Sequence, residues 1–159
     1  MTFDGAMLHT PLGTESRVSS YVHFCRNGIL EAVTTSLLET RQVPGQRLIP
    51  HVAFEGNVLE YLPRCVESVR QLGVRPRVSV FLTLVGVRGL RMAMDAFSLD
   101  RGNEIREETF ILPGAAIDTF SMSASSILRP MFDRVWNACG LLRSPNFDEA
   151  GNWAPSRGF

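Results

Sequence analysis

Alternating apolar and polar positions near the start of the sequence predict a β-hairpin. The two runs with this alternation, residues 19–25 and 29–33, flank the dipeptide Asn27-Gly28. Both central residues of a type I′ turn need a positive φ, which Asn and Gly adopt at low cost. The pattern therefore favours a hairpin with a two-residue turn.

The turn type sets the predicted register of this hairpin. A two-residue loop places Arg26 opposite Ile29 and Phe24 opposite Glu31. Residues 1–18, which precede this hairpin, contain the turn-forming residues Pro11, Gly13 and Ser16. We expect this N-terminal segment to be irregular.

Apolar residues at three- and four-residue spacing predict a helix over residues 57–72. Pro63 lies inside this pattern and is expected to kink the helix. Gly73 follows the last apolar position, where glycine commonly ends a helix. The apolar positions are Val58, Leu59, Leu62, Val66, Val69 and Leu72.

The strongest helical pattern lies near the C-terminal end, where apolar residues form one continuous stripe. Ser123 is placed to cap the start of this helix, and Gly140 is placed to end it. The stripe comprises Ile127, Leu128, Met131, Phe132, Val135, Trp136 and Cys139.

The middle of the chain predicts further strands. Residues 77–85 lack polar alternation, so we expect a central strand that is covered on both faces. A glycine-rich turn is expected to bring residues 90–97 back beside this strand. Residues 108–120 predict another strand, bent at Pro113-Gly114.

Together these elements predict a single α+β domain over residues 1–159. The order is β-hairpin, helix, β-hairpin, strand and helix, which corresponds to an antiparallel sheet of about five strands with two main helices. Residues 141–159 form a tail that contains Phe147 and Trp153. Large aromatic side chains are seldom left free in water, so we expect this tail to pack on the domain.

Composition narrows the class of protein. The 159 residues are 45% hydrophobic and 20% charged, which excludes a disordered tract and a charged coiled coil. The longest apolar stretch, residues 78–87, is far shorter than the roughly 20 residues that span a bilayer. Three cysteines without a Cys-x-x-Cys pair, and a start without a basic segment, favour reduced thiols in a cytoplasmic protein.

Candidate catalytic chemistry is sparse. His23 and Cys25 project from the same side of one predicted strand, an arrangement in which a Cys–His nucleophile can arise. No Asn or Asp is placed to orient this histidine, so a hydrolase stays an alternative and no residue is assigned a catalytic role. The three histidines have no metal-ligand spacing, and we expect neither a metal nor a cofactor.

Charge is unevenly distributed along a chain whose formal net charge is zero and whose sixteen basic residues are all arginine. Residues 64–91 hold six arginines and one acid, whereas residues 95–118 hold six acids and two arginines. Three interpretations stay open: local salt bridges, a patch for phosphate or nucleic acid, and head-to-tail complementarity between subunits. The candidate patch comprises Arg75, Arg77, Arg88 and Arg91.

Three stretches of the sequence resemble, in order, one group of bacterial proteins. They read YVHFCRNGILEAV from Tyr21, LVGVRGLRM from Leu84, and LRPMFD from Leu128 through to SPNFDEAGNW at Trp153. Members of this group carry an N-terminal Schlafen-like, Alba-type domain that is expected to bind DNA. The chain is similar to the region that follows that domain, and the resemblance covers most of residues 3–153.

The resemblance implies an accessory domain whose DNA-binding module lies outside this sequence, so no functional residue is transferred. We therefore expect a non-catalytic domain for oligomerisation or partner binding. Its expected partner is a second copy of the chain, and nucleic acid would be reached through a separate domain or chain. We expect no membrane partner. Nucleic-acid or nucleotide binding through the arginine patch, and an uncharacterised hydrolase, are the alternatives.

Overall fold

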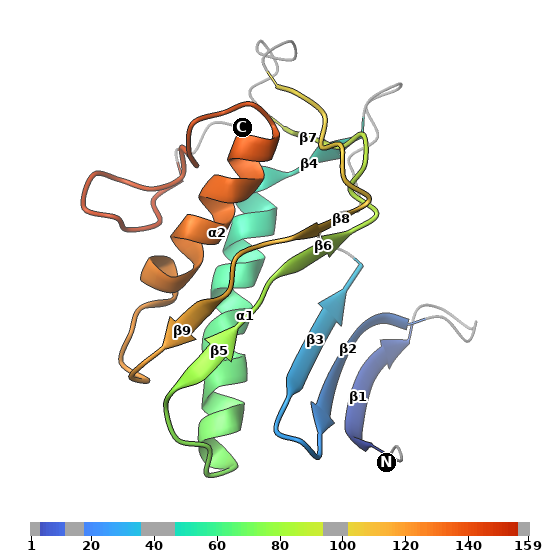
Figure 1. Ribbon diagram of the computed structural model, residues 1–159, viewed down its shortest axis with the longest axis vertical. Helices are drawn as coiled ribbons and strands as arrows, with labels where there is room; N and C mark the ends of the chain where they lie inside the picture. Colours follow the sequence, from blue (N-terminus) through green and yellow to red (C-terminus); the bar gives the residue numbers. More distant parts are fainter. Residues whose placement is uncertain (1–3, 12–17, 36–46, 94–101, 156–159) are drawn as a thin grey trace. The chain divides into compact units, whose positions relative to one another are not determined.

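The chain forms two compact units, Met1–Glu39 and Thr40–Phe159, where the hydrophobic pattern predicts one domain. The fold class is α+β, as predicted. Within the described residues the strands form four separate sheets rather than one sheet of five strands. The computed structural model (Figure 1) describes residues 4–11, 18–35, 47–93 and 102–155.

The N-terminal unit is a three-stranded antiparallel sheet in the order β1-β2-β3 (Figure 1). The strands are β1 (Gly5–Pro11), β2 (Val18–Cys25) and β3 (Leu30–Thr34). Since β1 falls within residues 1–18, the prediction of an irregular segment is wrong for Gly5–Pro11. Pro11 is tolerated because it ends a strand at the edge of this sheet, where its missing N–H breaks little pairing.

The turn between β2 and β3 has three residues rather than two. The Cys25 N–H donates to the Ile29 carbonyl at 2.8 Å, and the Gly28 N–H donates to the Cys25 carbonyl at 3.0 Å. Gly28 has a φ of +87°, whereas no non-glycine residue described has a positive φ. The predicted type I′ turn is therefore wrong, because Asn27 does not adopt the left-handed conformation that this turn needs.

The longer turn shifts the register of the hairpin by one residue. His23 lies opposite Glu31, and Phe24 lies opposite Leu30, so the predicted pairing of Phe24 with Glu31 is wrong. A slip of one residue moves every side chain of a strand to the other face of the sheet. Glu31 therefore shares a sheet face with His23 and Cys25.

Helix α1 (His51–Gln71) begins six residues before its predicted start. The residue before it, Pro50, makes no side-chain cap hydrogen bond, so the sequence carries no polar start signal there. The helix continues past Pro63. Gly73 follows the helix with a φ of +81°, as its place in the sequence predicts.

Helix α2 (Ala124–Ala138) begins where the sequence predicts. The Ser126 N–H donates to the Ser123 hydroxyl at 3.2 Å, which confirms Ser123 as the cap. Gly140 follows the helix with a φ of +79°. The Leu141 N–H then donates back to the Trp136 carbonyl at 2.9 Å, which satisfies an otherwise unpaired carbonyl at the helix end.

A two-stranded antiparallel ribbon lies on one side of the helices (Figure 1). One strand consists of β5 (Val78–Val80) and β6 (Thr83–Val85), and the other of β8 (Thr109–Ile111) and β9 (Ala115–Ile117). β5 pairs with β9 and β6 with β8, and the register changes by one residue between the two ladders. The additional residue falls at Pro113-Gly114, which confirms the predicted bend.

The predicted hairpin between residues 77–85 and 90–97 is wrong. Instead β7 (Arg91–Met92) pairs in parallel with β4 (Leu48–Ile49), and residues 94–97 lie outside the described part of the chain. The reason lies in the turn, where both Val87 and Leu90 have 0% exposed surface. Because these two side chains are buried, the chain after β6 enters the core and does not return alongside residues 77–85.

The ribbon also differs from the prediction of a strand covered on both faces. Side chains of residues 78–85 alternate between exposed and less exposed positions, as expected for a sheet with one solvated face. The core lies under the inner face, where α2 contacts both α1 and β9. Phe54 of α1 and Phe132 of α2 meet edge to face there, with ring centroids 5.6 Å apart.

Candidate functional site

One buried carboxylate of the C-terminal unit accepts hydrogen bonds from four side chains. Glu55 on α1 has no exposed surface, and its two oxygens accept four hydrogen bonds. Oε1 accepts from Trp136 Nε1 at 2.7 Å and from Ser144 Oγ at 2.8 Å. Oε2 accepts from Asn146 Nδ2 at 2.9 Å and from Trp153 Nε1 at 3.2 Å. We call these five residues the Glu55 cluster.

The Glu55 cluster ties together three parts of the chain. The acid lies on α1, one donor lies on α2, and the other three donors lie on the segment that follows α2. Burying a charged carboxylate costs several kcal/mol, whereas each hydrogen bond to a charged group contributes about 1.5–3 kcal/mol. Four such bonds to neutral donors hold the carboxylate in place, and they hold the C-terminal segment against both helices.

His51 borders the cluster, one helical turn before Glu55. The Asn146 amide nitrogen lies 3.0 Å from His51 Nδ1 and donates to Glu55 Oε2 at 2.9 Å. Because an amide nitrogen is only a donor, Nδ1 is the acceptor in this pair. The His51 ring also meets Trp136 edge on, with centroids 5.3 Å apart. Through these contacts His51 helps to fix the positions of the Asn146 and Trp136 side chains that bind Glu55.

The hydrophobic pattern gives no direct indication of this cluster because the predicted helix starts at residue 57, just after Glu55. Extending its apolar stripe by one turn toward the N-terminus would place Glu55 on the buried face. A buried acid needs partners, and Trp153 is one of the two aromatic residues that predict a packed tail. These two signals together would have pointed to the contact.

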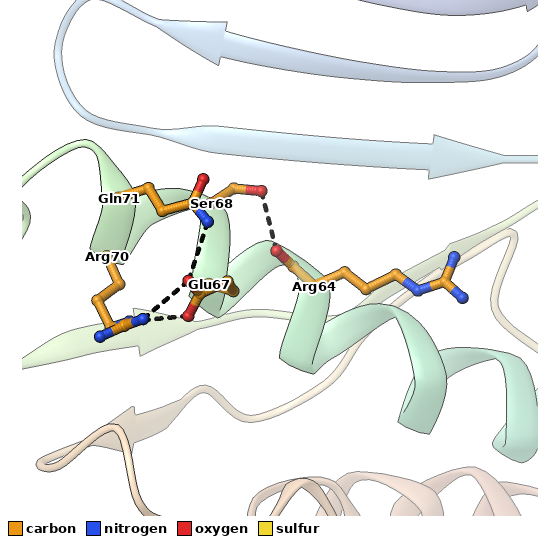
Figure 2. A network of polar contacts seen from close by, with 5 residues as sticks. All are labelled: Arg64, Glu67, Ser68, Arg70 and Gln71. Carbon is orange, nitrogen blue, oxygen red and sulfur yellow. Dashed lines mark hydrogen bonds and ion pairs between the residues drawn. The ribbon is translucent and has the colours of Figure 1, made fainter.

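An exposed polar network lies near the other end of α1 (Figure 2). Arg70 donates to both oxygens of Glu67, at 2.7 and 2.9 Å, and Gln71 donates to the same carboxylate at 3.0 Å. The adjacent Ser68 hydroxyl donates to the carbonyl of Arg64, one turn earlier in the helix, at 2.9 Å. Arg70 above all, with Gln71, lowers the pKa of Glu67 to about 2.

Three of the four candidate arginines form exposed ion pairs with acids. The pairs are Arg77–Asp118, Arg91–Glu104 and Arg88–Glu108, with N–O distances of 2.7, 2.9 and 3.7 Å. Arg75 is exposed between α1 and β5. Such pairs support the interpretation of the charge pattern as local salt bridges, each of small energetic value.

The ribbon separates the candidate arginines. Arg77 precedes β5 at one end, and Arg88 follows β6 at the other. Arg88 and Arg91 do come together, because both line a polar hollow of about 510 Å³ to which Arg106 and Glu104 also contribute. This hollow is the place where the structure gathers positive side chains from the predicted patch.

The N-terminal sheet brings the predicted Cys–His pair together. Cys25 Sγ lies 3.6 Å from His23 Nδ1. Glu31, opposite His23 in the register, accepts a hydrogen bond from the Tyr21 hydroxyl at 2.9 Å. In the predicted register Glu31 lies opposite Phe24 and so projects from the sheet face opposite to that of His23. For this reason the sequence pattern indicates no acid beside this histidine.

The outer face of the ribbon is apolar. Phe81, Val85 and Ile111 are 73%, 65% and 70% exposed, and Thr83 and Thr109 are exposed beside them. We call these five residues the outer ribbon face. The described ribbon residues, 78–85 and 109–117, include no charged side chain, and ion pairs flank the ribbon at its two ends.

Comparisons with known proteins leave the family open. No family model matches the chain, and no curated protein and no solved structure matches it either. None of the described helices is long and apolar enough to cross a membrane. Within the described ranges, no group of three or more His, Cys, Asp or Glu side chains is arranged to hold a metal ion.

Replacing Glu55 by Gln tests the Glu55 cluster. A Gln side chain offers one oxygen and one NH₂ group, so two of the four donors lose their acceptor. Each buried donor without a partner costs about 1–3 kcal/mol, and we expect unfolding in urea to be easier by about 2–5 kcal/mol. The two tryptophans of the chain both donate to Glu55, so Trp fluorescence reports directly on the cluster.

Glu60→Gln is the matched control, since Glu60 is exposed on the same helix and pairs with Arg64. We expect it to change the unfolding free energy by less than about 1 kcal/mol. Equal losses for the two variants would mean that the Glu55 cluster does not hold the segment.

The Glu67 carboxyl is expected to titrate near pH 2, which carbon-detected NMR of the side chain measures. Its folded-state pKa lies below the unfolded value of 4.5, so the pairing stabilises the fold above about pH 4.5 and this stabilisation is lost as the pH falls toward 2. Arg70→Gln removes the main donor and should return the midpoint toward 4.5. A wild-type midpoint already near 4.5 would contradict the pairing.

Proposed function

We propose that this chain is a non-catalytic accessory domain that associates with a second copy of itself through the outer ribbon face. By its resemblance to the Schlafen-like, Alba-type group, it would hold two copies of a DNA-binding module together. The observation that carries the proposal is an uncharged face on which three large apolar side chains are at least 65% exposed.

Water contact at such a face is unfavourable, and its burial contributes about 25 cal/mol for each Å² of apolar surface. Single exposed apolar residues are common on protein surfaces, but a contiguous apolar patch usually marks an interaction site. Phe81 adds an aromatic anchor of the type that dominates interfaces. Its ring lies over Gly114, where an added Cβ would approach within 2.7 Å of it.

Charge complementarity favours a second copy as the occupant. Each end of the ribbon carries one cation and one anion, Arg77 with Asp118 and Arg88 with Glu108. If two ribbons stack about a two-fold axis, each end, which carries one arginine and one acid, meets an end of the other copy that also carries one arginine and one acid. A formal net charge of zero adds no long-range repulsion between copies.

The size of the face sets the expected strength. A strand of eight residues spans only about 26 Å, so two strands offer less than the roughly 800 Å² per partner of a standard interface. The association should therefore be weak and reversible, with a dissociation constant in the micromolar range.

Analytical ultracentrifugation of the full chain over low to high micromolar concentrations tests this proposal. We expect a monomer–dimer equilibrium that Ile111→Arg weakens at least about tenfold, because a buried, unpaired charge opposes association. Leu142→Arg is the matched control, since Leu142 is 88% exposed but lies after α2 and outside the outer ribbon face. It should leave the dimer unchanged. A wild-type monomer throughout, or equal loss in both variants, overturns the proposal.

A second candidate function is phosphate or nucleic-acid binding in the hollow that Arg88, Arg91 and Arg106 line. Three guanidinium groups suit phosphate oxygens, although Glu104 and Glu108 already pair with two of them. This candidate predicts a mobility shift with DNA or RNA at low salt that weakens steeply as salt is added. Arg106→Gln should reduce it, and absence of any shift at low salt would exclude it.

A further inference from the structure

We propose that Cys25 is a reactive thiol that exchanges with small disulfides, with His23 as its proton acceptor and Glu31 as a residue that positions the histidine. This site lies entirely within the N-terminal sheet. It is independent of the self-association proposed above, which uses the other unit of the chain.

The geometry of the thiol and the imidazole is the first support. The 3.6 Å between Cys25 Sγ and His23 Nδ1 is a sulfur–nitrogen hydrogen bond. The thiolate, not the thiol, is the nucleophile in exchange reactions. A histidine in direct contact is the usual group that takes the thiol proton.

The register supplies a third group. Glu31 stands directly across from His23 on β3 and therefore projects from the same sheet face. The Tyr21 hydroxyl donates to Glu31 Oε2 at 2.9 Å, which holds this carboxylate on that face. A carboxylate next to an imidazole stabilises the imidazolium that forms when the thiol loses its proton.

Access to the sulfur is the next requirement. On β1, the residue opposite Cys25 is Gly5, which has no side chain to cover the thiol on that face. The Cys25 side chain itself is partly exposed. A small disulfide therefore meets no side chain from the residue directly across on β1.

Other ionisable groups on this face are few. On β2 they are Tyr21, His23 and Cys25, on β3 Glu31, and on β1 His9, which lies opposite Tyr21. Met7 is the β1 residue opposite His23. Within these strands the His23 imidazole is the base in contact with the sulfur. The rate of disulfide exchange at Cys25 should therefore depend on pH through the Cys25–His23 pair.

The exchange balances without any additional reactant. The Cys25 thiol gives its proton to His23, and the thiolate attacks one sulfur of the incoming disulfide. A new S–S bond forms to Cys25 while the old S–S bond breaks. The leaving thiolate takes the proton from His23, so Cys25 is oxidised and half of the small disulfide is reduced.

The other two cysteines are internal references. Burial raises the pKa of both the Cys65 and the Cys139 thiols, and Cys139 has no exposed surface. A raised thiol pKa lowers the thiolate fraction near neutral pH. We therefore expect Cys25 to react at least about tenfold faster than either of them.

The experiment treats the full chain with dithiodipyridine, a small aromatic disulfide, and follows each cysteine by mass spectrometry of its peptide. The wild-type ratio of rates needs no variant, so it stands even if a substitution disturbs the sheet. His23→Gln should slow the reaction of Cys25 with dithiodipyridine about tenfold near neutral pH. The part of the pH dependence of this rate that comes from the imidazole should be lost.

His9→Gln is the matched control, since it replaces a histidine on the same face that lies opposite Tyr21 rather than beside the thiol. It should leave the rate of Cys25 unchanged. Glu31→Gln should slow Cys25 less than His23→Gln does, with a shift in the pH profile that a purely structural role would not produce. Equal rates for Cys25 and Cys65, or a His23→Gln variant that reacts like the wild type, overturn the proposal.

Discussion

The C-terminal unit depends on satisfying one buried charge. Glu55 sits among apolar side chains on α1, where an ionised carboxylate without partners would oppose folding by several kcal/mol. Its four donors come from α2 and from the segment after it. Because the acid is satisfied only when all of these segments are in place, its burial couples the packing of the two helices to the docking of the C-terminal segment.

The two units divide the chemistry of the chain between them. The C-terminal unit places its polar groups either inside, around Glu55, or in exposed ion pairs at the ends of the ribbon, and this arrangement leaves the outer ribbon face uncharged. The N-terminal sheet instead collects a thiol, an imidazole, a phenol and a carboxylate on one face. An apolar face suits association, whereas a face of adjacent ionisable groups suits proton transfer.

Small changes of backbone geometry decide what both surfaces present. One additional residue in the turn before β3 places Glu31 across from His23 instead of Phe24. One additional residue at Pro113-Gly114 lets β8 and β9 each keep an apolar side inward along a bent strand. In both places the side-chain period of two makes a one-residue slip equivalent to turning the strand over.

Local patterns in the amino-acid sequence are enough to predict the α+β class, the existence of both helices, the cap at Ser123, the helix ends before Gly73 and Gly140, and the bend at Pro113-Gly114. These features follow from local rules of periodicity, capping and proline geometry, which act over a few residues. Three features follow instead from long-range packing: residues 77–85 pair with 109–117 rather than with 90–97, the chain divides into two units, and Glu55 is buried. These strand pairings and buried polar contacts join residues 24 to 98 positions apart. Their energies depend on how the whole core packs, which no local pattern determines.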